Sequence, residues 1–178
     1  DNLVSRHVSI FGMSGSGKSL LSEMVYQELK PKNDNLVLLD GDILRDVFGG
    51  DADHTVEGRA VNARRLSYLS KFLADQNIHV IAAVLSIFPD WQNWNRKNIS
   101  GYCQVYIDVP LDVLRRREIK GLYASALEGK IKNVVGVDID FPEPVNNDLV
   151  IDNSEDREDF GPFVEKILCL PQIMGKMS

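Results

Sequence analysis

The chain of 178 residues contains little cysteine and lacks both a long hydrophobic run and an excess of positive charge. Its two cysteines, Cys103 and Cys169, have no metal-binding spacing, which excludes a disulfide-rich fold and favours a reducing compartment. No apolar run approaches the roughly 18–20 residues that span a bilayer, and residues 1–7 lack the hydrophobic region of a signal peptide. We therefore expect a cytoplasmic protein with no membrane partner.

The balance of charge is acidic: 20 Lys and Arg stand against 26 Asp and Glu, a net charge of −6. Proteins that bind nucleic acid usually carry a net basic face, so this balance predicts no nucleic-acid partner. A small anionic ligand is not excluded, because it requires only a local cluster of positive charge. The hydrophobic fraction of 44% is enough for one core, and we expect residues 1–178 to form a single domain.

Apolar segments of strand length alternate with helical patterns along the chain. The expected strands are His7–Phe11, Leu36–Leu39, His79–Leu85, Cys103–Val109 and Leu149–Ile151, and the expected helices are Lys18–Leu29, Arg59–Gln76, Leu111–Arg117 and Glu158–Leu168. Several strands are nearly continuous in apolar residues, which is typical of strands buried on both faces of a parallel sheet. The pattern predicts a three-layer α/β fold with a central parallel five-stranded sheet, with ligands bound beyond the carboxyl ends of the strands.

The run Gly12-Met13-Ser14-Gly15-Ser16-Gly17-Lys18-Ser19 directly follows the first expected strand. It matches the phosphate-binding loop G-x-x-x-x-G-K-[ST] of P-loop NTPases, with a strand before it and a helix after it. Its backbone N–H groups can bind phosphate oxygens, Lys18 can reach the β- and γ-phosphates, and the Ser19 hydroxyl can ligate Mg²⁺. The alternative is a flexible Gly/Ser turn. The predicted ATP-binding residues of this segment are Gly12, Ser14, Gly15, Ser16, Gly17, Lys18, Ser19 and Leu20.

Two carboxylates, Asp40 and Asp42, follow the second expected strand. At the carboxyl edge of the sheet, either could hold Mg²⁺ through water, and one could accept a proton from an attacking hydroxyl group. The alternative is an Asp-Gly turn that caps a helix starting near Ile43. Arg45 follows one helical turn later, where it could contact an anionic acceptor.

The long helical pattern changes character along its apolar face. Leu66, Leu69 and Leu73 form the centre of that face, and Asn62 lies on it one turn earlier, flanked by Arg59 and Arg65. A buried Arg/Asn group without a ligand would carry a large desolvation cost. The pattern therefore predicts a pocket for an anionic substrate; the alternative is a helix that protrudes past the core.

Together these elements resemble the adenosine 5′-phosphosulfate (APS) kinases, from Ile10 to about Asp152. The matching segments are Gly12–Ser19, Leu39–Asp42 with Arg45, Arg59-x-x-Asn62-x-Arg64-Arg65, Ser86, Val105–Pro110, Lys120-Gly121-Leu122-Tyr123 and Gly136-Val137-Asp138. The resemblance implies a P-loop kinase that transfers the γ-phosphate of ATP to the ribose 3′-hydroxyl of APS, with Mg²⁺. A homodimer is expected on the same basis.

The resemblance also implies roles for individual residues. The catalytic residues would be Asp42, as base or metal partner, Lys18 and the supporting Asp40, and the metal ligands would be Ser19 and Asp40. The substrate-binding residues would be Asp42, Arg45, Arg59, Asn62, Arg65, Ser86, Lys120, Gly121 and Leu122, with Tyr123 also shaping the pocket. Residues 111–132 would form a helical lid, whose Arg115, Arg116 and Arg117 could close over the phosphates, Arg115 being the predicted ATP ligand. Ser86 can carry phosphate in some relatives, but we interpret it here as a polar strand-end residue.

The chain departs from the family pattern near the expected acceptor. His54-Thr55 replaces a Phe-Ser pair, Gly58 and Val61 replace acidic residues, and Trp91-Gln92 replaces an Asp-Arg pair. One alternative is therefore the same chemistry on another nucleotide, notably cytidine diphosphoramidate in capsular polysaccharide modification. Another is an NTP-binding regulatory module without turnover. We interpret His54 as a loop residue, and Trp91 and Trp94 as packing together against the sheet, with stacking on a base as the alternative.

Overall fold

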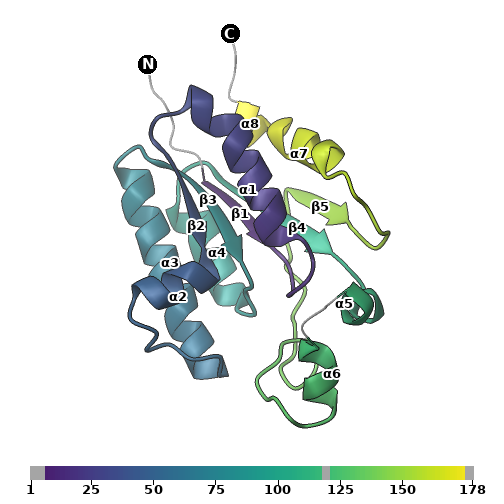
Figure 1. Cartoon of the computed structure of the whole chain (residues 1–178). Helices are drawn as coiled ribbons and strands as arrows, with labels where there is room; N and C mark the ends of the chain where they lie inside the picture. The colour runs from purple at the N-terminus through teal and green to yellow at the C-terminus, as the bar shows by residue number, and fades with distance from the viewer. Residues whose placement is uncertain (1–6, 118–120, 175–178) are drawn as a thin grey trace.

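The computed structural model describes residues 7–117 and 121–174 and contains one parallel five-stranded sheet, with strand order β2-β3-β1-β4-β5 (Figure 1). The strands are β1 (His7–Phe11), β2 (Leu36–Asp40), β3 (His79–Val84), β4 (Tyr102–Asp108) and β5 (Leu149–Asp152). All four pairings are parallel. The predicted strands and sheet are confirmed, with strand ends that differ by no more than one residue.

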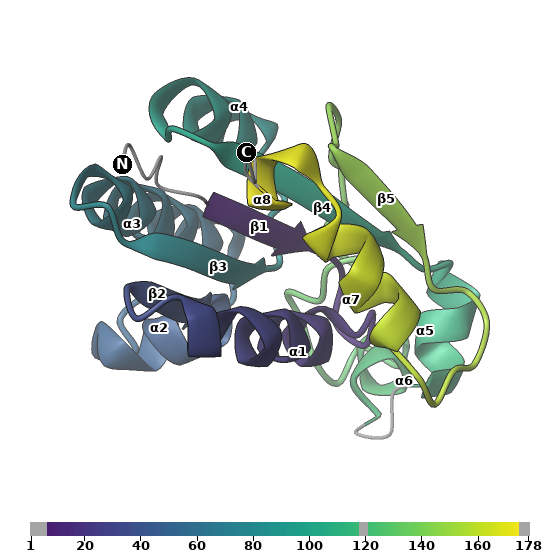
Figure 2. The same ribbon diagram turned by 90° about the horizontal axis from the view of Figure 1, so that it is seen from above.

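Helices cover both faces of the sheet, which confirms the three-layer fold (Figure 2). The helices are α1 (Lys18–Leu29), the 3₁₀ turn η1 (Lys30–Lys32), α2 (Gly41–Val47), α3 (Val56–Asp75), α4 (Pro89–Asn98), α5 (Leu111–Arg117), α6 (Leu122–Leu127), α7 (Gly161–Leu168) and α8 (Pro171–Met174). Helices α1 and α7 lie on one face, and α3 and α4 on the other. Alternation along β1 follows this division: Val8 and Ile10 pack with Leu21 of α1, whereas Phe11 packs with Leu66 of α3.

Helix α3 begins at Val56, three residues before its expected start, because Thr55 caps it. The Thr55 hydroxyl accepts a hydrogen bond from the backbone N–H of Gly58 at 3.1 Å. Helix α7 begins later than expected, at Gly161 instead of Glu158. The short helices α6 and α8 were not expected from the sequence.

The two tryptophans of α4 pack with each other and with α3. Trp91 and Trp94 meet edge to face at a centroid distance of 5.7 Å, and both contact the ring of Tyr68. The prediction that they pack together is confirmed, although the contacted ring belongs to α3 and not to the sheet. Within the described part of the chain, no helix has the length and apolar character needed to cross a membrane.

His7 is buried on the face of the sheet that α3 and α4 cover. Its Nε2 lies 2.8 Å from the Ser9 hydroxyl, and its ring stacks on Tyr102 at 5.3 Å between centroids. Burial lowers the pKa of His7 to about 3. The folded protein therefore holds this imidazole neutral at a pH where the unfolded chain binds a proton.

This burial predicts a loss of stability in acid. Below about pH 6.5 the unfolded chain gains a proton that folded His7 does not accept until about pH 3, so stability is complete above that range and falls as the pH falls through it. Between pH 6 and 5 we expect the free energy of unfolding to fall by about 1 kcal/mol more in the wild type than in a His7→Gln variant. Urea unfolding of both proteins across this range measures the difference, and parallel curves would contradict the assignment.

Candidate active site

The phosphate loop joins β1 to α1 and requires glycine at two positions. Gly15 and Gly17 have φ angles of +83° and +92°, in the left-handed region that side chains rarely adopt. A Cβ atom on Gly17 would also lie 2.9 Å from the ring of Phe160. Gly17 is the N-cap of α1, so the loop leads directly to a helix N-terminus, the positive end of the helix dipole. The structure thus supplies the geometry that the motif predicts.

Lys18 begins α1 and is buried, with 9% of its surface exposed. Burial lowers the pKa of its ammonium group, while the negative charges of Asp42 and Asp40 raise it. The Lys18 ammonium group thus interacts electrostatically with both carboxylates that follow β2. This is expected because β1 and β2 end at the same edge of the parallel sheet.

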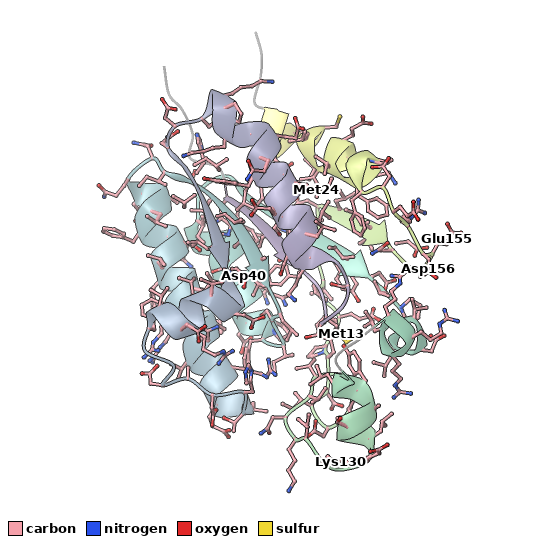
Figure 3. The ribbon with its side chains drawn as sticks, viewed as in Figure 1. Met13, Met24, Asp40, Lys130, Glu155 and Asp156 are labelled. Atoms are coloured by element: carbon pink, nitrogen blue, oxygen red, sulfur yellow. The ribbon has the colours of Figure 1, made fainter. Side chains whose placement is uncertain are left out.

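Asp40 lies at the carboxyl end of β2 (Figure 3) and accepts three hydrogen bonds. The Ser19 hydroxyl donates to its Oδ2 at 3.0 Å. Its Oδ1 accepts from the backbone N–H of Asp42 at 2.8 Å and of Ile43 at 3.3 Å, so it caps α2. The helix-cap interpretation of Asp40 is therefore confirmed, and the same side chain brings a carboxylate to the hydroxyl of Ser19.

The pair formed by Ser19 and Asp40 fits a magnesium ion that is held mainly by phosphates. Magnesium prefers oxygen ligands and usually takes only one or two from a protein, with water and substrate phosphates completing its shell. Across residues 7–117 and 121–174, no three His, Cys, Asp or Glu side chains cluster as a metal site. The donor set therefore suits a nucleotide-bound ion better than a permanently held one.

A cavity of about 410 Å³ opens beside Asp42. Its walls come from the phosphate loop, α2, α3, the end of β3, α6 and the segment 131–135. The lining residues are Ser14, Asp42, Arg45, Asp46, His54, Arg59, Leu85, Leu122, Ile131, Lys132, Asn133, Val134 and Val135. A smaller adjoining cavity shares Asp42, Arg45, Arg59 and Leu85 and adds Lys18 and Asn62. Asp42 is thus one of the residues that line both cavities, and the smaller cavity is also lined by the phosphate-loop lysine.

The two arginines of the cavity are held by backbone oxygens. Arg45 is buried and its guanidinium group donates to the carbonyl oxygens of Ala52 and Asp53. Arg59 donates from Nε to the His54 carbonyl at 2.9 Å and from a terminal nitrogen to the Asn133 carbonyl at 3.0 Å. These contacts fix the position of both groups and leave their charges unneutralised by the contacting atoms.

The positive charge of the two cavity arginines shifts two pKa values. Burial lowers the pKa of Arg59 and the charge of Arg45 lowers it further, while the charges of Asp42 and Asp138 raise it. Burial also lowers the pKa of His54, with Arg45 and Arg59 acting in the same direction. An anion in the cavity would relieve this repulsion, so the electrostatics favour an anionic ligand.

The structure brings most of the predicted substrate-binding residues to these cavities. Asp42, Arg45, Arg59 and Leu122 line the large one, and Asn62 lines the small one, where its amide donates to the Gly41 carbonyl at 2.9 Å. Gly121, at φ +69°, is the N-cap of α6 and positions Leu122. Lys120 lies outside the described residues.

Three predicted residues lie elsewhere. Arg65 forms a two-bond ion pair with Asp51, at 2.5 and 2.8 Å, and does not line the cavity. Ser86 is buried, accepts from the Phe88 N–H at 3.4 Å and lines a separate small cavity that His7 also lines. Arg115 is exposed on α5. For Arg65, the placement differs from the sequence expectation because a carboxylate 14 residues away occupies its guanidinium group.

The sequence predicts the other lining residues only in part. His54 lines the cavity, which agrees with its place among the departures near the acceptor, although we interpret it as a loop residue. The predicted lid reaches only residue 132 of the lining segment 131–135, and nothing in the sequence singles out Asp46. The Asp138 carboxylate shapes that segment by accepting from the N–H groups of Asn133 and Val134, each at 2.6 Å. The Gly136-Val137-Asp138 match was the signal that pointed to this region.

Comparison with known proteins links this site to a family. A family model described as adenylylsulphate kinase matches residues 5–152. A cytidine diphosphoramidate kinase from Campylobacter jejuni is 43% identical over 143 residues, which are 80% of this chain and 83% of that protein. An adenylyl-sulfate kinase from Paraburkholderia xenovorans is 34% identical over 168 residues, 94% of this chain and 93% of that protein. The structure of a Mycobacterium tuberculosis APS kinase with AMPPNP and APS has a TM-score of 0.83 at 32% identity, covering 93% of this chain and 96% of that one.

Proposed function

Because the chain belongs to the adenylylsulphate kinase family, a family of phosphotransferases, we propose that it transfers the γ-phosphate of ATP to the ribose 3′-hydroxyl of a nucleotide, with APS as the first candidate acceptor. The position of Asp42 carries the proposal. Its carboxylate lines both the large cavity and the small cavity that contains Lys18. A base in that position can serve a hydroxyl on one side and a triphosphate on the other.

In the proposed reaction, the phosphate loop and Lys18 bind the donor. Backbone N–H groups of the phosphate loop hold the phosphate oxygens, and the N-terminus of α1 adds its positive end. Lys18 places its charge at the β- and γ-phosphates, where negative charge shifts toward the leaving ADP. These groups position the phosphates before the reaction, which is where most of the rate gain in phosphoryl transfer arises.

The acceptor binds in the large cavity. Arg45 and Arg59 hold its anionic group, and Asp42 accepts the proton from the ribose hydroxyl as the hydroxyl oxygen attacks the γ-phosphorus. The P–O bond to ADP then breaks, and ADP leaves. Leu122 and the segment 131–135 cover the cavity and help to exclude water, which would otherwise compete as the acceptor.

Ser19 and Asp40 are the residues that would hold Mg²⁺. When bound with ATP, the ion would neutralise part of the negative charge of the phosphates. Asp40 keeps its carboxylate aimed at Ser19 because its second oxygen caps α2.

An Asp40→Asn substitution separates these two roles. The amide oxygen can still cap α2, so we expect the melting temperature to change little, while kcat at limiting Mg²⁺ falls about a hundredfold because the carboxylate is lost. Activity measured against Mg²⁺ concentration checks this result. An Asp40→Ala control should also lose the cap, at a cost of about 1 kcal/mol of stability. Unchanged Mg²⁺ dependence in Asp40→Asn would contradict the role.

The main alternative acceptor is cytidine diphosphoramidate. The 43% identity to the Campylobacter jejuni enzyme supports it. So does the cavity wall: among the described lining residues there is no Phe, Tyr or Trp, and His54 stands where the family pattern has an aromatic residue. A smaller, differently hydrogen-bonded base could use a histidine in that place.

A coupled assay of ADP release with each nucleotide discriminates the two acceptors. We expect turnover with APS. Turnover of cytidine diphosphoramidate without turnover of APS would replace the first candidate with the second and leave the chemistry unchanged. The homodimer and the cytoplasmic location stay predictions; light scattering of the purified protein tests the first.

A further inference from the structure

The phosphate loop receives hydrogen bonds on its outer side from residues that follow it by more than a hundred positions. Backbone N–H groups can turn toward phosphates only if the carbonyl groups of the same loop turn away. Carbonyl groups that turn into the protein need donors, because an unpaired buried carbonyl is costly. Two carbonyl groups of this loop, on either side of Gly15, have such donors.

The first donor is Tyr123 in α6. Its side chain is buried, with 1% exposed, and its hydroxyl donates to the Ser14 carbonyl at 2.9 Å. The preceding residue, Leu122, lines the acceptor cavity. One turn of α6 therefore contacts both the cavity and the phosphate loop.

The second donor is Asn153, directly after β5. Its side chain is 3% exposed, and its amide nitrogen donates to the Ser16 carbonyl at 3.0 Å. Asn153 is itself held by Arg117, the last residue of α5, whose guanidinium group donates to the Asn153 carbonyl at 2.6 Å and to Asp156 at 2.9 Å. Asp156 lies on the loop that follows β5 (Figure 3).

We propose that Tyr123 and Asn153 are positioning residues for ATP: their hydrogen bonds to the Ser14 and Ser16 carbonyls hold the phosphate loop in the conformation that turns its N–H groups onto the phosphates. Gly15, at φ +83°, allows this backbone conformation, and the two hydrogen-bond donors stabilise it. Arg117 extends the second contact to α5, so both helices that flank residues 118–120 are tied to the donor loop. The inference rests on the proposed use of ATP.

The test measures the affinity of ATP in the presence of Mg²⁺ by isothermal titration calorimetry. The variants are Tyr123→Phe and Asn153→Leu, which remove each donor and keep most of the side-chain volume. Tyr102→Phe is the matched control, because it removes another buried tyrosine hydroxyl. That hydroxyl donates to Gln104 at a distance of 3.1 Å and does not contact the phosphate loop. Thermal unfolding followed by circular dichroism identifies a temperature at which every variant is folded, and the titrations are done at that temperature.

We expect the Kd of ATP to rise about tenfold in Tyr123→Phe and in Asn153→Leu, and to stay within about twofold in Tyr102→Phe. In Asn153→Leu, whose side chain is not part of either cavity lining, the Kd of the accepted nucleotide should also stay within about twofold, which a general loss of structure would not allow. An unchanged Kd of ATP in folded Tyr123→Phe would overturn the proposal. Failure of the unmodified chain to bind ATP would instead contradict the proposed function, so the two failures are distinguishable.

Discussion

Replacing Asp42 by asparagine is expected to lower kcat about a thousandfold while the Kd of ATP changes less than about threefold. The amide has nearly the shape of the carboxylate but cannot accept the proton of the ribose hydroxyl. Asp42 lines both the large cavity and the small one that Lys18 also lines, so we expect its loss to affect the chemical step more than either binding step. Steady-state kinetics and calorimetric titration with ATP separate these effects.

The control for this substitution is Asp46→Asn, which removes a carboxylate that lines the same cavity but not the small one beside Lys18. Its kcat should stay within about tenfold of the wild-type value. Full activity in Asp42→Asn would remove Asp42 from the mechanism. Equal losses of kcat in both variants would mean that any change of charge in the cavity lowers activity, and that Asp42 is not the catalytic base.

Replacing Lys18 by alanine is expected to have the second large effect on catalysis. We expect kcat/KM for ATP to fall between about a hundredfold and a thousandfold, because the transferring phosphate loses a positive charge held at a fixed position. Asp40 and Asp42 interact with this ammonium group, since their charges raise its pKa. Without Lys18, the two carboxylates have lost this positive charge. The two carboxylates should then repel an incoming triphosphate, which raises KM.

Lys71→Ala is the control for Lys18, because its exposed ion pair with Asp75 on α3 lies outside the cavity walls. Its kinetics should match those of the wild type. Wild-type kinetics in Lys18→Ala would contradict the assignment of residues 12–19 as the phosphate-binding loop.

The sheet and the phosphate loop could be predicted because local sequence specifies them. Continuous apolar runs indicate buried parallel strands, and Gly15 and Gly17 occupy backbone conformations that few other residues adopt. Helix starts were less certain, since they depend on single side chains. Because Thr55 caps α3, the helix begins at Val56, three residues before its expected start at Arg59.

The walls of the cavity were harder to predict because they depend on contacts between distant segments. Arg65 has the helical spacing of a pocket residue, but Asp51 occupies its guanidinium group. His54 looked like a loop residue, yet the fold of residues 48–55 brings it to the cavity beside Arg45 and Arg59. The contact between Tyr123 and Ser14 joins residues 109 positions apart, and no local pattern signals it.

The central claim is that this chain moves the γ-phosphate of ATP to a ribose 3′-hydroxyl. The most direct measurement incubates the chain with γ-³²P-labelled ATP and the accepted nucleotide, and in parallel with the 3′-deoxy analogue of that nucleotide. We expect labelled nucleotide from the first reaction and none from the second. Labelled inorganic phosphate alone in the first reaction, or equal labelling of the 3′-deoxy analogue, would contradict it.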